Sequence, residues 1–144
     1  METATMGKVL VRAKVENLKD LYKVDLGLIP QNEARFVEVS NALVDTGATA
    51  LSMPRQLIAQ LGLDPVRRRQ ARTSAGTITV QVFATVRLTI QGRDCVCDVT
   101  ELPDDCPVLI GQVPLEILDF VVDPVNQRLI GNPAHGGEHI IELY

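Results

Sequence analysis

The sequence predicts an all-β, barrel-like fold with one or two short helices. Several segments alternate apolar and polar residues, which is the period of a strand with one buried face. The chain has no Trp, two Tyr and three Phe, so Val, Leu and Ile must build most of the core, and such cores are typical of strands. Short strands separated by turn residues are typical of closed or barrel-like sheets.

Size and charge narrow the class of protein further. The 144 residues, 46% of them hydrophobic, suit a single domain, 1–144, with one core. The net charge of −4 and a pI of about 5.1 do not suggest a nucleic-acid partner. No apolar run approaches the roughly 20 residues of a membrane span, and Met1–Met6 lacks the apolar stretch of a signal peptide. We therefore expect a cytoplasmic protein with no membrane partner.

The first half of the chain contains three expected strands and one expected helix. Alternating segments predict strands at 8–16 and 35–44, and 50–53 is expected to be a short strand. Between the first two strands, residues 17–31 contain Gly27 and Pro30 and predict a hairpin or wide turn. Residues 56–61 are good helix formers, preceded by Pro54 and followed by Gly62, which are typical start and stop signals.

The second half begins with a long hairpin over 67–90, whose turn is Ser74-Ala75-Gly76. Glycine at such a turn permits a positive φ. Further strands are expected at 95–102, 107–111, 120–123 and 127–130, with a short helix at 113–118. The Gly- and Pro-rich residues 132–137 predict a linker, and 139–144 predict a final strand.

The strongest functional signal is the motif Asp45-Thr46-Gly47-Ala48, which follows the apolar run of residues 42–44. A carboxylate, a hydroxyl and a glycine at the end of a buried strand form the active-site arrangement of aspartic proteases. The triplet alone is weak, because Asp-Thr-Gly is also a good turn sequence. A second apolar strand ending in glycine, Val108-Leu109-Ile110-Gly111, strengthens the functional interpretation.

Over about residues 35–131, these features resemble bacterial retropepsin-like proteins, the single-domain, retroviral-type aspartic proteases. The resemblance implies a closed acid-protease barrel, with a hairpin flap that closes over an extended peptide. It implies that Asp45 is catalytic, that Thr46 and Gly47 frame it, and that Gly111 packs behind it. The substrate-contacting residues would be Ala48, Thr49, Ser74, Ala75 and Gly76.

The chemistry of this family requires two carboxylates and no metal or organic cofactor. One carboxylate is ionised and takes a proton from water, while the other is protonated and polarises the scissile carbonyl. This chain has a single Asp-Thr-Gly triplet, so the second carboxylate must come from a second subunit. We therefore expect a homodimeric aspartic endopeptidase. The alternative is a non-catalytic peptide-binding or dimerisation module on the same fold.

Two departures from the retroviral pattern leave the specificity and the dimer open. Thr49 and Ala50 stand where retroviral enzymes carry acidic residues that contact substrate, so substrate preference cannot be transferred. Gln112 replaces an Arg that these enzymes tie to the subunit interface. The expected strand 139–144 could either interleave with a second subunit or pair within its own.

Other candidate residues carry weaker signals. Basic side chains cluster at Arg67, Arg68, Arg69 and Arg72. They form either a solvated hairpin arm or a contact for an acidic substrate or anionic partner. The odd cysteine count (Cys95, Cys97, Cys106) argues against a disulfide framework and favours small buried side chains. Glycines between His135 and His139 oppose a helical zinc motif, so we expect no metal site.

Overall fold

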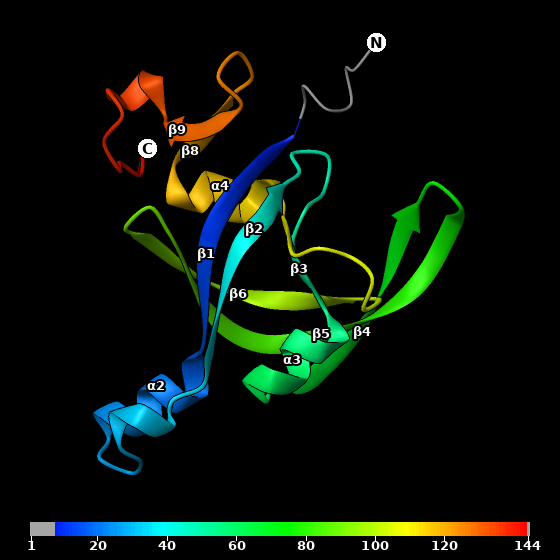
Figure 1. Ribbon diagram of the computed structural model, residues 1–144, viewed down its shortest axis with the longest axis vertical. Helices are drawn as coiled ribbons and strands as arrows, with labels where there is room; N and C mark the ends of the chain where they lie inside the picture. Colours follow the sequence, from blue (N-terminus) through cyan, green and yellow to red (C-terminus); the bar gives the residue numbers. More distant parts are fainter. Residues whose placement is uncertain (1–7, 144) are drawn as a thin grey trace.

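The computed structural model describes residues 8–143, and its main feature is one curled, mixed sheet (Figure 1). Its strands are β1 (Val9–Asn17), β2 (Phe36–Val44), β3 (Leu51–Pro54), β4 (Asp64–Thr73), β5 (Gly76–Ile90), β6 (Arg93–Leu102) and β7 (Leu109–Ile110). Neighbours follow the order β1-β2-β7-β3-β6-β5-β4, and β1 also pairs with β5. This last pairing brings the sheet round on itself so that it nearly closes. The predicted all-β acid-protease fold is confirmed.

The core lies inside this curl and consists mainly of aliphatic side chains. Strand β1 supplies alternate residues, with Val9, Ala13 and Val15 at most 2% exposed. Leu51 and Ile110 are fully buried where β3 meets β7. Phe120 is the one aromatic side chain among the buried apolar residues of the described chain. The core is therefore the aliphatic one that the composition predicts.

Three short α-helices accompany the sheet in the described residues: α2 (Leu18–Asp25), α3 (Arg55–Leu61) and α4 (Gln112–Leu118). The sequence predicted α3 and α4. Helix α3 ends where expected, because Gly62 adopts the left-handed conformation (φ 65°). Two single turns of 3₁₀ helix, η1 (Gln31–Glu33) and η2 (Pro133–His135), complete the helical elements of this part of the chain.

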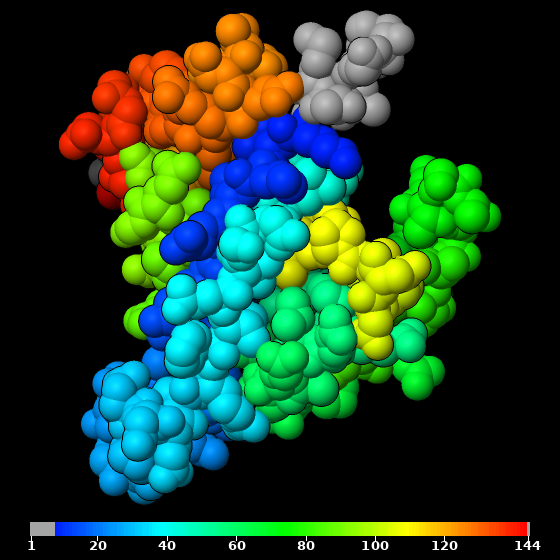
Figure 2. Space-filling model, in the orientation of Figure 1, coloured from blue at the N-terminus to red at the C-terminus, as the bar shows by residue number. Residues whose placement is uncertain are grey.

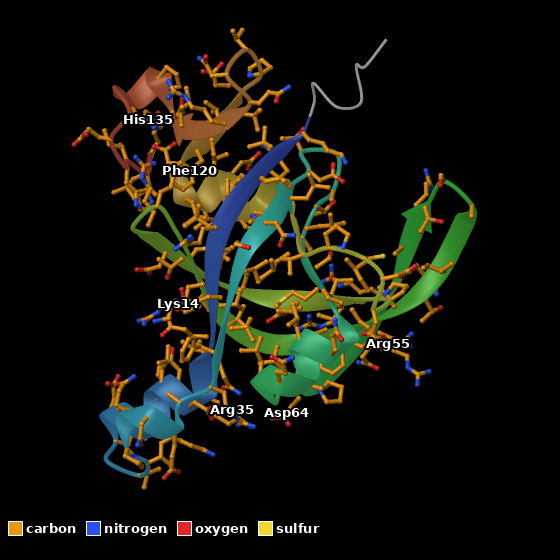
Figure 3. All side chains as sticks on the ribbon, viewed as in Figure 1. Lys14, Arg35, Arg55, Asp64, Phe120 and His135 are labelled. Atoms are coloured by element: carbon orange, nitrogen blue, oxygen red, sulfur yellow. The ribbon has the colours of Figure 1, made fainter. Side chains whose placement is uncertain are left out.

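Helix α2 corrects the prediction of a hairpin or wide turn over 17–31. The buried Asn17 caps the helix, since its side-chain oxygen accepts the Asp20 N–H at 3.0 Å. The carboxylate of buried Asp20 then accepts the Arg35 Nε–H at 2.8 Å and the Arg35 Nη2–H at 3.1 Å. These bonds lower the pKa of Asp20. Arg35 lies beneath the sheet in Figure 3, where it ties α2 to the start of β2.

The C-terminal part forms a small two-stranded sheet whose Phe120 and Leu129 pack into the common core. Strands β8 (Phe120–Asp123) and β9 (Arg128–Gly131) pair as the predicted hairpin. Residues 139–143 do not form the strand predicted for 139–144, and Tyr144 lies outside the described residues, as do Met1–Met6. Instead, Ile140 donates its backbone N–H to the buried carboxylate of Asp119 (3.1 Å). That donor is used by a side chain, so it is not free to join a ladder.

Within residues 8–143, no helix has the length and apolar character that crossing a bilayer requires.

Candidate active site

The loop that carries Asp45 is fixed on its N-terminal side by strand pairing. The end of β2 pairs in parallel with β7, with Leu43 opposite Leu109 and Val44 opposite Ile110. The N–H of Asp45 continues this ladder by donating to the Ile110 carbonyl at 3.0 Å. The Asp45 carbonyl then accepts the Ala48 N–H at 3.0 Å, which closes a tight turn. Asp45 therefore emerges at the end of a buried strand, as the sequence predicts.

The Asp45 carboxylate is half-buried, and its orientation is set by its own loop. Its Oδ1 accepts the N–H of Gly47 at 3.0 Å. A Cβ at residue 47 would lie 3.2 Å from the same oxygen, and the backbone there has an ordinary φ. The need for glycine comes from this close approach and not from a left-handed turn. No basic side chain in residues 8–143 forms an ion pair with Asp45.

The segment that begins at Gly111 holds the loop from behind. Gly111, Gln112 and Val113 donate their N–H groups to the carbonyls of Ala50 (3.0 Å), Ala48 (2.8 Å) and Thr49 (3.0 Å). A Cβ on Gly111 would lie 2.6 Å from the Ala50 carbonyl oxygen. No side chain fits in that space, so the two segments can pack this closely only with glycine at residue 111.

The predicted substrate-contacting residues fall into two separate groups. Ala48 and Thr49 belong to the Asp45 loop, whereas Ser74, Ala75 and Gly76 form the exposed tip of the β4–β5 hairpin. Figure 2 shows this tip, in green, standing clear of the main body. At the tip, the Thr73 Oγ1 accepts the Ala75 N–H at 3.2 Å and donates to the Gly76 carbonyl at 2.8 Å.

A cavity of about 210 Å³ lies between the loop and the base of the hairpin. It is lined by residues of the loop exit and β3, the hairpin, β6 and α4: Thr49, Ala50, Leu51, Arg67, Arg69, Val82, Cys97, Asp98, Thr100, Val113 and Pro114. A larger hollow of about 550 Å³ against β1 and β9 includes no residue of the Asp45 loop. The smaller cavity borders the Asp45 loop through Thr49 and Ala50 and is therefore within reach of a peptide bound at Asp45.

The sequence did not identify most of the residues that line this cavity. Arg67 and Arg69 belong to the basic run, for which the sequence leaves open a solvated arm or a contact for an acidic substrate or anionic partner. The structure separates them from Arg68, which lines a different depression with Gln81. Strand alternation was the available signal, because residues two apart on a strand share a face.

Cys97 also faces the cavity, but its environment does not favour a thiolate. A hydrogen bond with the Cys95 thiol, together with burial, raises the pKa of Cys97. The thiolate is the reactive form of cysteine, so Cys97 is expected to line the cavity as a neutral thiol. In the described part of the chain, no cluster of three or more His, Cys, Asp or Glu side chains could hold a metal ion.

Comparison with known proteins provides an independent test of these interpretations. A family model described as aspartyl protease matches residues 32–113, which is more than half of the chain. The match spans the Asp45 motif, the β4–β5 hairpin and Gly111. No curated protein matches the chain. On its motif, its fold and this match, the chain belongs to the aspartyl protease family and is of the retropepsin-like kind.

Proposed function

We propose that the protein is a homodimeric endopeptidase in which the Asp45 carboxylates of two subunits activate a water molecule between them. The family assignment supports a protease-type function and a peptide substrate. The observation that carries the proposal is the setting of Asp45. Its backbone is fixed by Ile110, its carboxylate is oriented by Gly47, and no cation neutralises it within the described residues.

The proposed mechanism follows from placing two such carboxylates a few Å apart. Both cannot ionise cheaply at that separation, so the pair shares one proton and titrates as a unit. The ionised carboxylate removes a proton from the water, and the resulting nucleophile attacks the scissile carbonyl. The protonated carboxylate donates a hydrogen bond to the carbonyl oxygen as it gains charge.

The exposure of the motif supports assembly with a second subunit. Thr46 and Gly47 are exposed beside the half-buried Asp45, so the loop is accessible from outside. The chain has one Asp-Thr-Gly motif, and a two-fold axis beside that motif would supply the missing carboxylate. In this arrangement, the Thr46 hydroxyl bonds across the axis and stiffens both loops.

The substrate is expected to bind as an extended strand between the loop and the hairpin. Ala48 and Thr49 would line one wall, and the tip residues Ser74, Ala75 and Gly76 would close over the peptide. The tip is exposed on all sides, which suits an element that moves to admit substrate. Closure would exclude water and fix the scissile bond beside Asp45.

The test is cleavage of a diverse peptide library by wild type, Asp45→Asn and a matched control, Asp105→Asn, at mildly acid and neutral pH. Asp105 is an exposed turn residue outside the site, so the control makes the same chemical change elsewhere. We expect cleavage by wild type and Asp105→Asn, and none by Asp45→Asn. Sedimentation of the same samples reports the dimer.

Equal cleavage by Asp45→Asn would contradict the mechanism. A folded dimer that cleaves no member of the library would contradict the endopeptidase and favour the peptide-binding module.

A further inference from the structure

The cavity between the Asp45 loop and the hairpin contains two guanidinium groups but only one carboxylate. Arg67 Nη1 pairs with Asp98 Oδ2 at 2.9 Å. The other oxygen of Asp98 accepts the Thr85 hydroxyl at 3.1 Å. Arg69 lines the same cavity, and no carboxylate in the described residues pairs with it. The positive charge of Arg69 is therefore not balanced.

The surrounding hairpin offers no acid that could balance this charge by moving. Residues 67–90 contain five Arg and no Asp or Glu, in a chain whose net charge is −4. Glu101 and Arg68 line a separate depression on the outer face of the hairpin, which does not face the cavity. Glu101 is held by Arg55 at 2.8 Å, and Figure 3 shows Arg55 near the base of the hairpin. Arg68, on the outer face, also has no carboxylate partner in the described residues. What distinguishes Arg69 is its place in the cavity beside Thr49 and Ala50 of the Asp45 loop.

The remaining walls of the cavity are largely apolar. Its apolar lining includes Leu51, Val82, Val113 and Pro114. Thr49 and Ala50, at the edge of the Asp45 loop, carry no charge that would repel an anion. Such a cavity matches a side chain with a short apolar stem and an anionic end.

We propose that this cavity is a specificity subsite for an acidic side chain of the peptide substrate, with Arg69 as its recognition residue. The inference rests on the proposed endopeptidase function. An extended peptide between loop and hairpin directs alternate side chains to opposite sides. One of them would enter the cavity beside Thr49 and Ala50. Glu suits it better than Asp, because its longer stem covers more of the apolar wall.

The test uses peptides from the cleavage library in which a single position carries Glu, Gln or Lys. We expect wild type to prefer Glu over Gln at one position by about fivefold in kcat/KM, the usual upper range for an exposed ion pair. The preference should fall as salt is added. Arg69→Gln should abolish it, and Arg69→Glu should reverse it in favour of Lys. The matched control is Arg68→Gln, on the opposite face of the strand, which should keep it.

A binding measurement separates failure of the subsite from failure of the endopeptidase. Fluorescein-labelled peptides with one Glu or one Gln at each position are titrated with Asp45→Asn and with Asp45→Asn/Arg69→Gln. If Asp45→Asn binds one Glu peptide more tightly than its Gln counterpart, and Asp45→Asn/Arg69→Gln does not, the subsite is supported even if wild type cleaves nothing. If wild type cleaves but Glu, Gln and Lys are equivalent, or Arg69→Gln keeps the preference, the subsite is wrong and the endopeptidase stands. Neither cleavage nor selective binding would overturn both.

Discussion

The Asp45 loop and the β4–β5 hairpin meet the same cavity, but they are built in opposite ways. Loop residues 45–50 are bonded from both sides: Asp45 to Ile110, and Ala48, Thr49 and Ala50 to the segment 111–113. The outer hairpin is held by its own ladder, from Arg67 opposite Val82 to Thr73 opposite Gly76. Its residues are mostly exposed, so few contacts outside the hairpin restrain them.

The loop and the hairpin meet two different requirements of the proposed chemistry. The reacting carboxylate must be held within a fraction of an ångström, and this needs a dense shell of bonds. The covering element must open and close, so it is expected to come from a part of the fold with low local stability. The following predictions test this contrast, beginning with the largest expected effect.

Replacing the glycine behind the loop should have the largest effect. Gly111→Ala places a Cβ 2.6 Å from the Ala50 carbonyl oxygen and the Thr49 carbonyl carbon. Both are backbone atoms that cannot rotate away. We expect a loss of about 3 kcal/mol in the free energy of unfolding, measured by urea denaturation. The matched control is Gly27→Ala, which has open space but a φ of +72° and should cost about 1 kcal/mol. Equal losses would mean that the loop is not tightly held.

Within the loop, Gly47→Ala should reduce activity without comparable loss of stability. The added Cβ would approach Asp45 Oδ1 to 3.2 Å, and the backbone conformation there accepts alanine. The carboxylate must shift to relieve this contact. The shift needed is a few tenths of an ångström, which is less than the roughly 1 Å misplacement that can cost about 10²-fold, so we expect kcat to fall by about tenfold. An exposed site changes the free energy of unfolding by about 0.5 kcal/mol or less. Full activity in this variant would contradict the claim that the loop sets the carboxylate.

The C-terminal segment should respond to pH while the loop does not. Hydrogen bonds from the protonated His135 ring to the carboxylates of Asp119 (2.7 Å) and Glu142 (2.9 Å) raise the pKa of His135. The stabilisation that protonated His135 gives to the folded C-terminal segment is therefore complete below the ordinary histidine pKa of about 6.5. It is lost as pH rises through the higher pKa of His135 in the folded state. The bond to His135 lowers the pKa of Asp119 to about 2, so this carboxylate stays ionised throughout that window.

Hydrogen exchange provides the measurement, because the Ile140 N–H donates to Asp119. After correction for intrinsic exchange, the protection of the Ile140 amide should fall as pH rises from about 6.5 through the raised pKa of His135. His135→Gln should remove this fall. The protection of the Asp45 and Gln112 amides should not fall with pH in this way. If it fell over the same pH range, the Asp45 loop would depend on the C-terminal segment.

The smallest effect is expected at the tip of the hairpin. Thr73→Val removes the two bonds that its hydroxyl makes with Ala75 and Gly76. Because the tip is exposed, the free energy of unfolding should change by about 0.5 kcal/mol or less. If the tip closes over substrate, KM should rise by a few-fold while kcat changes little. The control is Thr77→Val, which makes the same change at the residue that pairs with Arg72, one step farther from the tip. An unchanged KM in Thr73→Val would argue against a closing tip.

Much of the fold could be predicted because its signals are local. The alternation in β1 and β2 matches their buried faces, and Gly62 ends α3 as predicted. The two regions that were predicted wrongly depend on distant partners. Helix α2 relies on Asp20 bonding Arg35, and residues 139–143 are held through Asp119. A pattern within a short window cannot reveal such pairs.

The candidate site likewise has one part that a local sequence pattern predicts and another part that depends on distant contacts. Asp45, Thr46 and Gly47 could be identified because their order alone indicates a chemistry. The cavity could not, since Arg69 meets Thr49 and Val113 only after β4 pairs with β5 and α4 packs behind the loop. Its charge balance also depends on the Arg67–Asp98 pair, which joins residues of different strands.

Subunit mixing tests whether each active site needs the Asp45 carboxylates of two chains. Wild type is held at a fixed concentration and Asp45→Asn is added, with time for subunits to exchange. If each site needs two Asp45 carboxylates, an equal amount of the variant should lower the activity to about half, and excess should lower it further, because mixed dimers are inactive. Asp105→Asn added in the same way should not lower it. Activity that stays constant as Asp45→Asn is added would show that each chain acts alone, and would contradict the account.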